Sequence, residues 1–123
     1  MAISTIKDNL KHYIDLEAVS FTPASGITTT SLLVRKACGI VTINGYITAT
    51  NAFSSSETLI ATFPAGARPA DTIRGIAGVA SQAYLPGDVA FVGINTSDRL
   101  AITAKSGNTY KVAYFSISYM AQN

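Results

Sequence analysis

The feature that most constrains this chain is a series of short alternating segments between residues 18 and 120, separated by turn residues at intervals of about 8–12 positions. In the segment 40–50, for example, Val41, Ile43 and Ile47 fall on one face of an extended strand, and polar side chains fall on the other. This alternation with a period of two residues is typical of strands that bury one face. The sequence therefore predicts a protein built almost entirely from β-strands.

The alternating segments and the turns between them predict eight strands. These are Ala18–Thr22, Thr28–Lys36, Ile40–Thr50, Glu57–Phe63, Thr72–Ala80, Val89–Ile94, Arg99–Ala104 and Tyr110–Met120. The connections are too short for the crossovers that parallel strands need. We therefore expect an all-β fold, an antiparallel β-sandwich or jelly-roll-like head.

The first residues follow a different pattern. Apolar residues recur at helical spacing in the segment 3–16, and Ser4 is suited to cap a helix start. The apolar residues at this spacing are Ile3, Ile6, Leu10 and Tyr13. We expect a short N-terminal α-helix in residues 1–17, which either packs on its own domain or attaches copies of the chain to one another in a trimer. The β-rich head domain then spans residues 18–123.

Composition narrows the choice of partners. The 123 residues are enough for one domain, and their net charge of +2 gives no reason to expect a nucleic-acid or membrane partner. Only 13% of residues are charged, against about 25% in typical soluble domains, whereas 48% are hydrophobic. This balance favours a surface that is partly covered by another subunit. The sequence contains no apolar run long enough to cross a bilayer, and Met1–Lys7 do not resemble a signal peptide.

Few residues suit catalysis. A single histidine, His12, and a single cysteine, Cys38, predict neither a disulfide nor a zinc site, and they do not support Ser–His or Cys–His catalysis. We therefore expect no enzyme activity, no metal and no cofactor. A pair of carboxylates acting as a glycosidase is the alternative that remains open. The acids available in the β-domain are Glu57, Asp71, Asp88 and Asp98, which all fall at strand ends or turns.

A binding surface is predicted at one end of the sheet. If the strands alternate up and down, the loops at 23–27, 51–56, 81–87 and 105–109 share one end, and the turns at 38–39, 64–71 and 95–98 share the other. The first end is rich in hydroxyl and amide groups, which suit saccharide recognition. The candidate ligand-binding residues are Asn51, Ser54, Ser81, Gln82, Tyr84 and Asn108. Tyr84 would add an aromatic face that carries a hydroxyl.

Four elements of the sequence form an ordered set. They are the strand pair Val34–Ile47, the Pro-Gly-Arg-Pro element Leu59–Pro69, the hairpin Val92–Ile102 and the closing strand Val112–Tyr119. Together these elements resemble the head domains of phage tail-fibre and baseplate receptor-binding proteins. The resemblance covers roughly residues 30–120 and rests on the four elements occurring in the same order.

The resemblance implies a homotrimeric β-sandwich head that binds host cell-surface saccharide without catalysis. It further implies that the protein is part of the virion, at the phage tail tip or baseplate, where it contacts other tail or baseplate proteins. The protein would be made in the host cytoplasm without a signal peptide. The alternative is a structural virion or baseplate assembly protein that does not bind saccharide.

Overall fold

Nine strands make up most of the residues that the computed structural model describes, which are residues 17–83, 85, 87–97 and 99–122. The strands are β1 Glu17–Ala18, β2 Thr22–Pro23, β3 Ile27–Ala37, β4 Ile40–Ala49, β5 Thr58–Thr62, β6 Ile73–Ala80, β7 Asp88–Ile94, β8 Arg99–Thr103 and β9 Val112–Met120. A single 3-10 turn, η1 Ala65–Ala67, is the one helical element in these residues.

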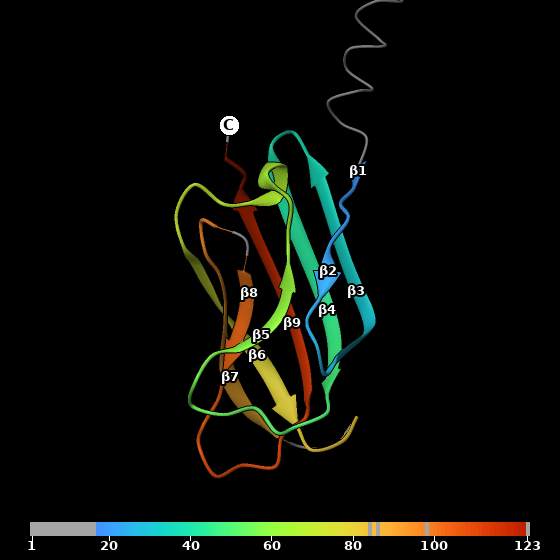
Figure 1. Cartoon of the computed structure of the whole chain (residues 1–123), viewed down its shortest axis with the longest axis vertical. Coiled ribbons are helices and arrows are strands. Elements are labelled where there is room, and N and C mark those ends of the chain that lie inside the picture. The colour runs from blue at the N-terminus through green and yellow to red at the C-terminus, as the bar shows by residue number, and fades with distance from the viewer. Residues whose placement is uncertain (1–16, 84, 86, 98, 123) are drawn as a thin grey trace, which may run out of the picture.

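All nine strands belong to one antiparallel sheet in the order β1-β3-β4-β9-β6-β7-β8-β5-β2. The outermost strands, β1 and β2, are separated by only three residues in the chain, so the sheet must curl until its two edges come together. Figure 1 shows the resulting barrel-like shape. Closing the sheet in this way leaves few unpaired strand edges, which limits edge-to-edge association.

Every neighbouring pair in the sheet is antiparallel, so the strand order fixes the direction of each strand. With this order, the strand direction alternates along the chain from β2 to β9. The connections β3–β4, β6–β7 and β7–β8 are hairpins between neighbours. The connections β4–β5, β5–β6 and β8–β9 join strands that are not neighbours, so these segments pass over the ends of the barrel. The predicted up-and-down alternation, and with it the predicted grouping of loops at each end, is confirmed.

The core lies inside the curled sheet and consists of the inward-facing half of each strand. Val41, Ile43 and Ile47 of β4 are fully buried, as are Leu100 and Ile102 of β8. No polar or charged side chain is buried among the described residues. The period-two pattern therefore identified the buried faces of both strands correctly.

Glycine is required at two positions for different reasons. At Gly45 the ring of Phe115 lies across the backbone, and an added Cβ would come within 2.5 Å of the Phe115 ring. At the β3–β4 turn, Cys38 and Gly39 both have positive φ angles, of 51° and 77°. Two successive positive φ angles are the requirement of a type I′ hairpin turn, and they explain the glycine that follows Cys38.

The predicted fold class is confirmed in its all-β, antiparallel character, and the predicted strands agree closely with seven of the observed ones. The predicted strand Ala18–Thr22 is wrong, because its ends pair with different partners. Ala18 pairs with Arg35 of β3, whereas Thr22 pairs with Thr62 of β5.

The predicted N-terminal helix at residues 3–16 lies outside the described residues. Its predicted extension to Glu17 is wrong, since Glu17 belongs to β1 and pairs with Lys36. In the part of the chain that the structure describes, no helix has the length and apolar character of a membrane span.

Candidate functional site

Four loops meet at one end of the barrel, which we call the loop end. It consists of residues 24–26, 50–57, 81–87 and 104–111, apart from the two residues of the third loop that are not described. Backbone hydrogen bonds hold the loops to one another. They run from Thr50 N to Gly26 O (2.8 Å), from Phe53 N to Tyr110 O (2.8 Å), from Ala104 N to Ser54 O (2.8 Å) and from Lys111 N to Ala80 O (3.0 Å). The loop end is therefore a connected surface.

The predicted binding residues lie at this end. Asn51, Ser54, Ser81 and Gln82 are exposed there, whereas Tyr84 lies outside the described residues. The Ser54 hydroxyl donates to Ser56 O at 3.2 Å, which leaves it exposed but partly engaged within its own loop. The structure confirms that these four side chains share one end, and their role in ligand binding stays a prediction.

Asn108 differs from the other predicted residues because its side chain is used to hold the loops together. The side-chain nitrogen donates to Phe53 O at 3.1 Å and also to Lys105 O. The side-chain oxygen accepts a hydrogen bond from Tyr110 N at 2.7 Å. These bonds connect the 50–57 and 104–111 loops, so Asn108 contributes to the shape of the loop end.

Replacing Asn108 by alanine is expected to lower the free energy of unfolding by about 1–3 kcal/mol, because the part-buried Phe53 O and Tyr110 N would lose their hydrogen-bond partner. Urea unfolding followed by circular dichroism measures the change. Asn51→Ala is the matched control, since it removes an exposed amide from the same end and should change stability by less than about 0.5 kcal/mol. Equal losses in the two variants would contradict the structural role of Asn108.

Asp88 is the described acid with a defined partner at the loop end. Its carboxylate accepts hydrogen bonds from Val89 N at 2.8 Å and from Lys105 Nζ at 3.1 Å. These two donors, Val89 N first, hold the pKa of Asp88 below its ordinary value. A general acid needs a raised pKa, so Asp88 does not suit that role in a glycosidase. Asp71 lies at the opposite end, in the β5–β6 connection, and Asp98 is outside the described residues.

The opposite end, which we call the termini end, is where the described chain enters and leaves the barrel. Glu17 pairs with Lys36 beside the β3–β4 turn, and Ala121 N donates to Gly39 O of that turn at 2.9 Å. The β5–β6 connection closes this end, fixed by the buried Tyr119 hydroxyl, which donates to Ala67 O at 2.5 Å. Both ends of the described chain therefore lie away from the loop end (Figure 1).

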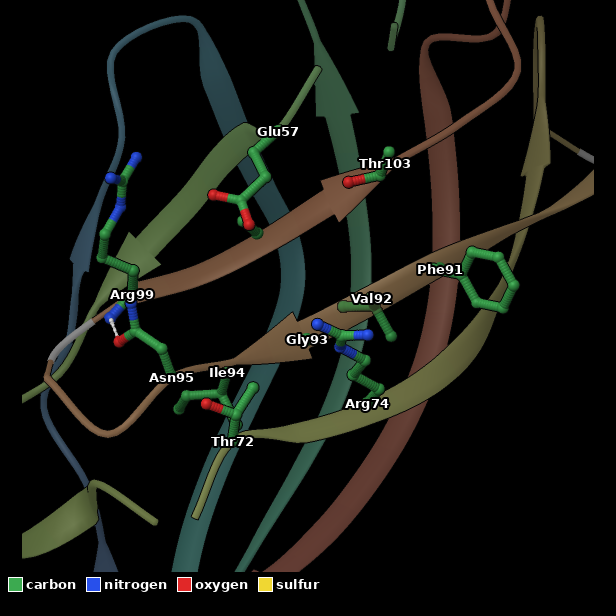
Figure 2. Close-up of a pocket in the computed structure, with 11 residues that line it drawn as sticks. Glu57, Thr72, Arg74, Phe91, Val92, Gly93, Ile94, Asn95, Arg99 and Thr103 are labelled. Atoms are coloured by element: carbon green, nitrogen blue, oxygen red, sulfur yellow. Dashed lines mark hydrogen bonds between the residues drawn. The ribbon is translucent and has the colours of Figure 1, made fainter. Parts of the chain in front are cut away.

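A groove on the side of the barrel is the main feature that the sequence prediction missed. Its floor is the cross-strand pair Gly93 and Ala101 on the outer face of β7 and β8. Its volume is about 370 Å³. The side chains around the floor are Glu57, Thr72, Arg74, Phe91, Asn95, Arg99 and Thr103 (Figure 2). A signal was present in the sequence, because two small residues occupy outward positions of the predicted hairpin beside Phe91 and Thr103.

An exposed apolar surface adjoins the groove. Ile76, Val89 and Phe91 are each about two-thirds exposed, and Tyr114 is 37% exposed. Ile76 is paired with Phe91, and both Val89 and Tyr114 are paired with Gly78, so the four side chains lie on three neighbouring strands, β9, β6 and β7. We call this surface the apolar wall. Exposed apolar surfaces of this kind commonly mark sites of protein association.

Comparison with solved structures identifies the fold. The head domain of lactococcal phage bIL170, from a study of the receptor-binding domains of lactococcal phages, superposes with a TM-score of 0.67 at 20% identity. The match covers 88% of this chain and 100% of that one. The chain has the fold of a phage receptor-binding head.

A second solved structure agrees with this assignment. The receptor binding protein of Listeria phage PSA superposes with a TM-score of 0.74 at 18% identity, covering 99% of this chain and 74% of that one. No family model matches the sequence, and no curated protein matches it. The resemblance expected from the four sequence elements is therefore confirmed at the level of the fold.

Proposed function

We propose that this protein is the receptor-binding head of a phage tail or baseplate, a homotrimer that binds a host cell-surface saccharide without catalysis. The observation that carries the proposal is the shared fold with receptor-binding domains of two phages. The arrangement of the chain supports it, because the polar loop end lies opposite the end where the chain enters and leaves. In this proposal the protein belongs to the virion, and other tail or baseplate proteins attach at the termini end.

The proposed mechanism is multivalent attachment. An exposed cluster of hydroxyl and amide groups makes hydrogen bonds that each contribute only about 0.5–1.5 kcal/mol in water. Three copies of the loop end in one particle, and several particles in one virion, would turn weak individual binding into stable adhesion. The apolar wall offers a surface through which copies of the chain would assemble.

The apolar wall also fits the alternative function, a structural virion protein that assembles with its neighbours and binds no saccharide. The two functions differ in one measurable property. An adhesion head should bind isolated bacterial cell-wall polysaccharide, whereas an assembly protein should bind only other virion proteins.

Removing polar groups from the loop end is expected to weaken polysaccharide binding about tenfold, which corresponds to the loss of two hydrogen bonds. Ser81→Ala with Gln82→Ala makes this change, and biolayer interferometry on immobilised cell-wall polysaccharide measures it. Thr96→Ala with Ser97→Ala is the matched control, because it removes polar groups from an exposed turn at the termini end. Equal binding by wild type and both variants would contradict a binding role for the loop end.

A further inference from the structure

Residues 17–26 run along the seam between β3 and β5, from the termini end to the loop end (Figure 1). We call this segment the strap. Its first part pairs with β3, where Val19 N donates to Val34 O at 2.9 Å. Its last part pairs with β5, where Ala24 N donates to Ile60 O at 2.9 Å. The strap therefore covers two strand edges that would otherwise be unpaired where the sheet closes.

The strap is held more weakly than the strands beside it. Its two strands, β1 and β2, have two residues each, whereas β3 has 11 and β4 has 10. None of residues 18–26 is fully buried. Val19 and Phe21 pack against the core, and the ring centroids of Phe21 and Phe63 are 6.1 Å apart. Segments with short ladders and little buried surface open locally at a lower free-energy cost than unfolding of the whole domain.

The far end of the strap is part of the loop end. Gly26 has a φ angle of 81°, and its carbonyl oxygen accepts a hydrogen bond from Thr50 N at 2.8 Å. Ile27 N donates to Ala24 O at 3.2 Å, which closes the turn that leads into β3. Thr50 directly precedes Asn51, one of the predicted binding residues. Release of the strap would therefore remove this turn from the loop end and leave Thr50 N without its partner.

We infer that the strap opens as one unit, before the rest of the barrel unfolds, and so couples the termini end to the loop end. A displacement that starts where the described chain enters the barrel breaks the pairing with β3, withdraws Phe21 from the core and then frees the turn at Gly26. Attachment at the termini end thereby influences the shape of the loop end. The consequence of this coupling for a ligand rests on the proposed saccharide-binding function.

Amide hydrogen exchange of ¹⁵N-labelled protein, followed by NMR, measures local opening. We expect equal protection factors for the Val19 and Ala24 amides, at least about tenfold lower than that of Ile43 in β4. The Thr50 amide should follow the strap, because its hydrogen-bond acceptor is Gly26 O. Protection of Val19 and Ala24 as strong as that of Ile43 would contradict local opening.

A disulfide tests whether the strap moves as one unit. Ala18 lies opposite Arg35 of β3, and the Cα atoms of such facing residues are about 4.5–5.5 Å apart, which suits a disulfide. Ala18→Cys with Arg35→Cys, made with Cys38→Ser to prevent mispairing, pins the strap near the termini end. Oxidation is expected to raise the protection of Ala24 and Thr50, at the other end of the strap, at least about tenfold. The same protein after reduction is the matched control.

A substitution in the strap should have the opposite effect. Phe21→Ala removes the contact with the core, and is expected to lower the protection of Ala24 and Thr50 at least about tenfold. The protection of Ile43 should fall by much less, because β4 lies outside the strap. Ser20→Ala is the matched control, since it changes an exposed residue of the strap and should leave protection unchanged.

Two further results would overturn the inference. Oxidation that protects Val19 but leaves Ala24 unchanged would show that the two halves of the strap open separately. An equal loss of protection at Ala24 and Ile43 in Phe21→Ala would show that the strap opens only with the whole barrel. Neither measurement uses a ligand, so either failure would leave the polysaccharide test of the loop end unaffected, and failure of that test would leave the strap in place.

Discussion

Replacing Phe53 by alanine is expected to lower the free energy of unfolding by about 3–5 kcal/mol, the usual cost of removing a large buried aromatic side chain. Phe53 lies in the connection that crosses the loop end, and only 2% of its surface is exposed. Its backbone N donates to Tyr110 O, and its backbone O accepts from the Asn108 side chain. The ring therefore closes the barrel where the two crossing loops meet.

Urea unfolding measures this loss, and Ser55→Ala is the matched control because it changes an exposed residue of the same loop. The control should change stability by less than about 0.5 kcal/mol. A loss below about 1 kcal/mol in Phe53→Ala would show that the loop end is not closed by this ring. The same variant should weaken polysaccharide binding, because the loops that it holds carry the predicted binding residues.

The second large effect concerns assembly. Wild-type protein is expected to sediment as a trimer at micromolar concentration, with three times the chain mass of 12.9 kDa. Ile76→Asp with Val89→Asp should convert it to monomer, because two charges would have to be buried in the centre of the apolar wall. Both side chains are 65% exposed in the single chain, so the substitutions should leave the barrel folded.

Sedimentation velocity with circular dichroism separates loss of assembly from loss of folding. Leu33→Asp is the matched control, since Leu33 is an exposed apolar residue on β3, away from the apolar wall. A wild-type monomer would contradict the proposed trimer. A trimer that survives the double substitution but is lost with Leu33→Asp would place the interface on the other side of the barrel.

The strands could be predicted from the sequence because burial alternates with chain position. Val41, Ile43 and Ile47 occupy one face of β4, and their alternation required no knowledge of neighbouring strands. The division of Ala18–Thr22 could not be predicted in this way. It depends on which strands lie on either side of the chain as the barrel closes, and residues 18 and 22 give no local sign of their different partners.

The functional surfaces, too, could be predicted only where they depend on the alternation of strand directions. Alternating strand directions were enough to bring the polar loops to one end, and this grouping is confirmed. The groove could not be derived from local alternation, because Arg74 and Glu57 reach it from β6 and from the residue before β5. Their proximity depends on the order β6-β7-β8-β5 in the sheet, which local alternation does not determine.

Binding of fluorescently labelled protein to intact bacteria, measured by flow cytometry, tests the proposed adhesion role most directly. The panel should include lactococci and Listeria, the hosts of the phages with related folds. We predict strong binding to a subset of strains, and loss of that binding after periodate oxidation destroys surface sugars. Folded trimer that binds no strain, or binding that periodate leaves unchanged, would contradict a head that recognises host saccharide.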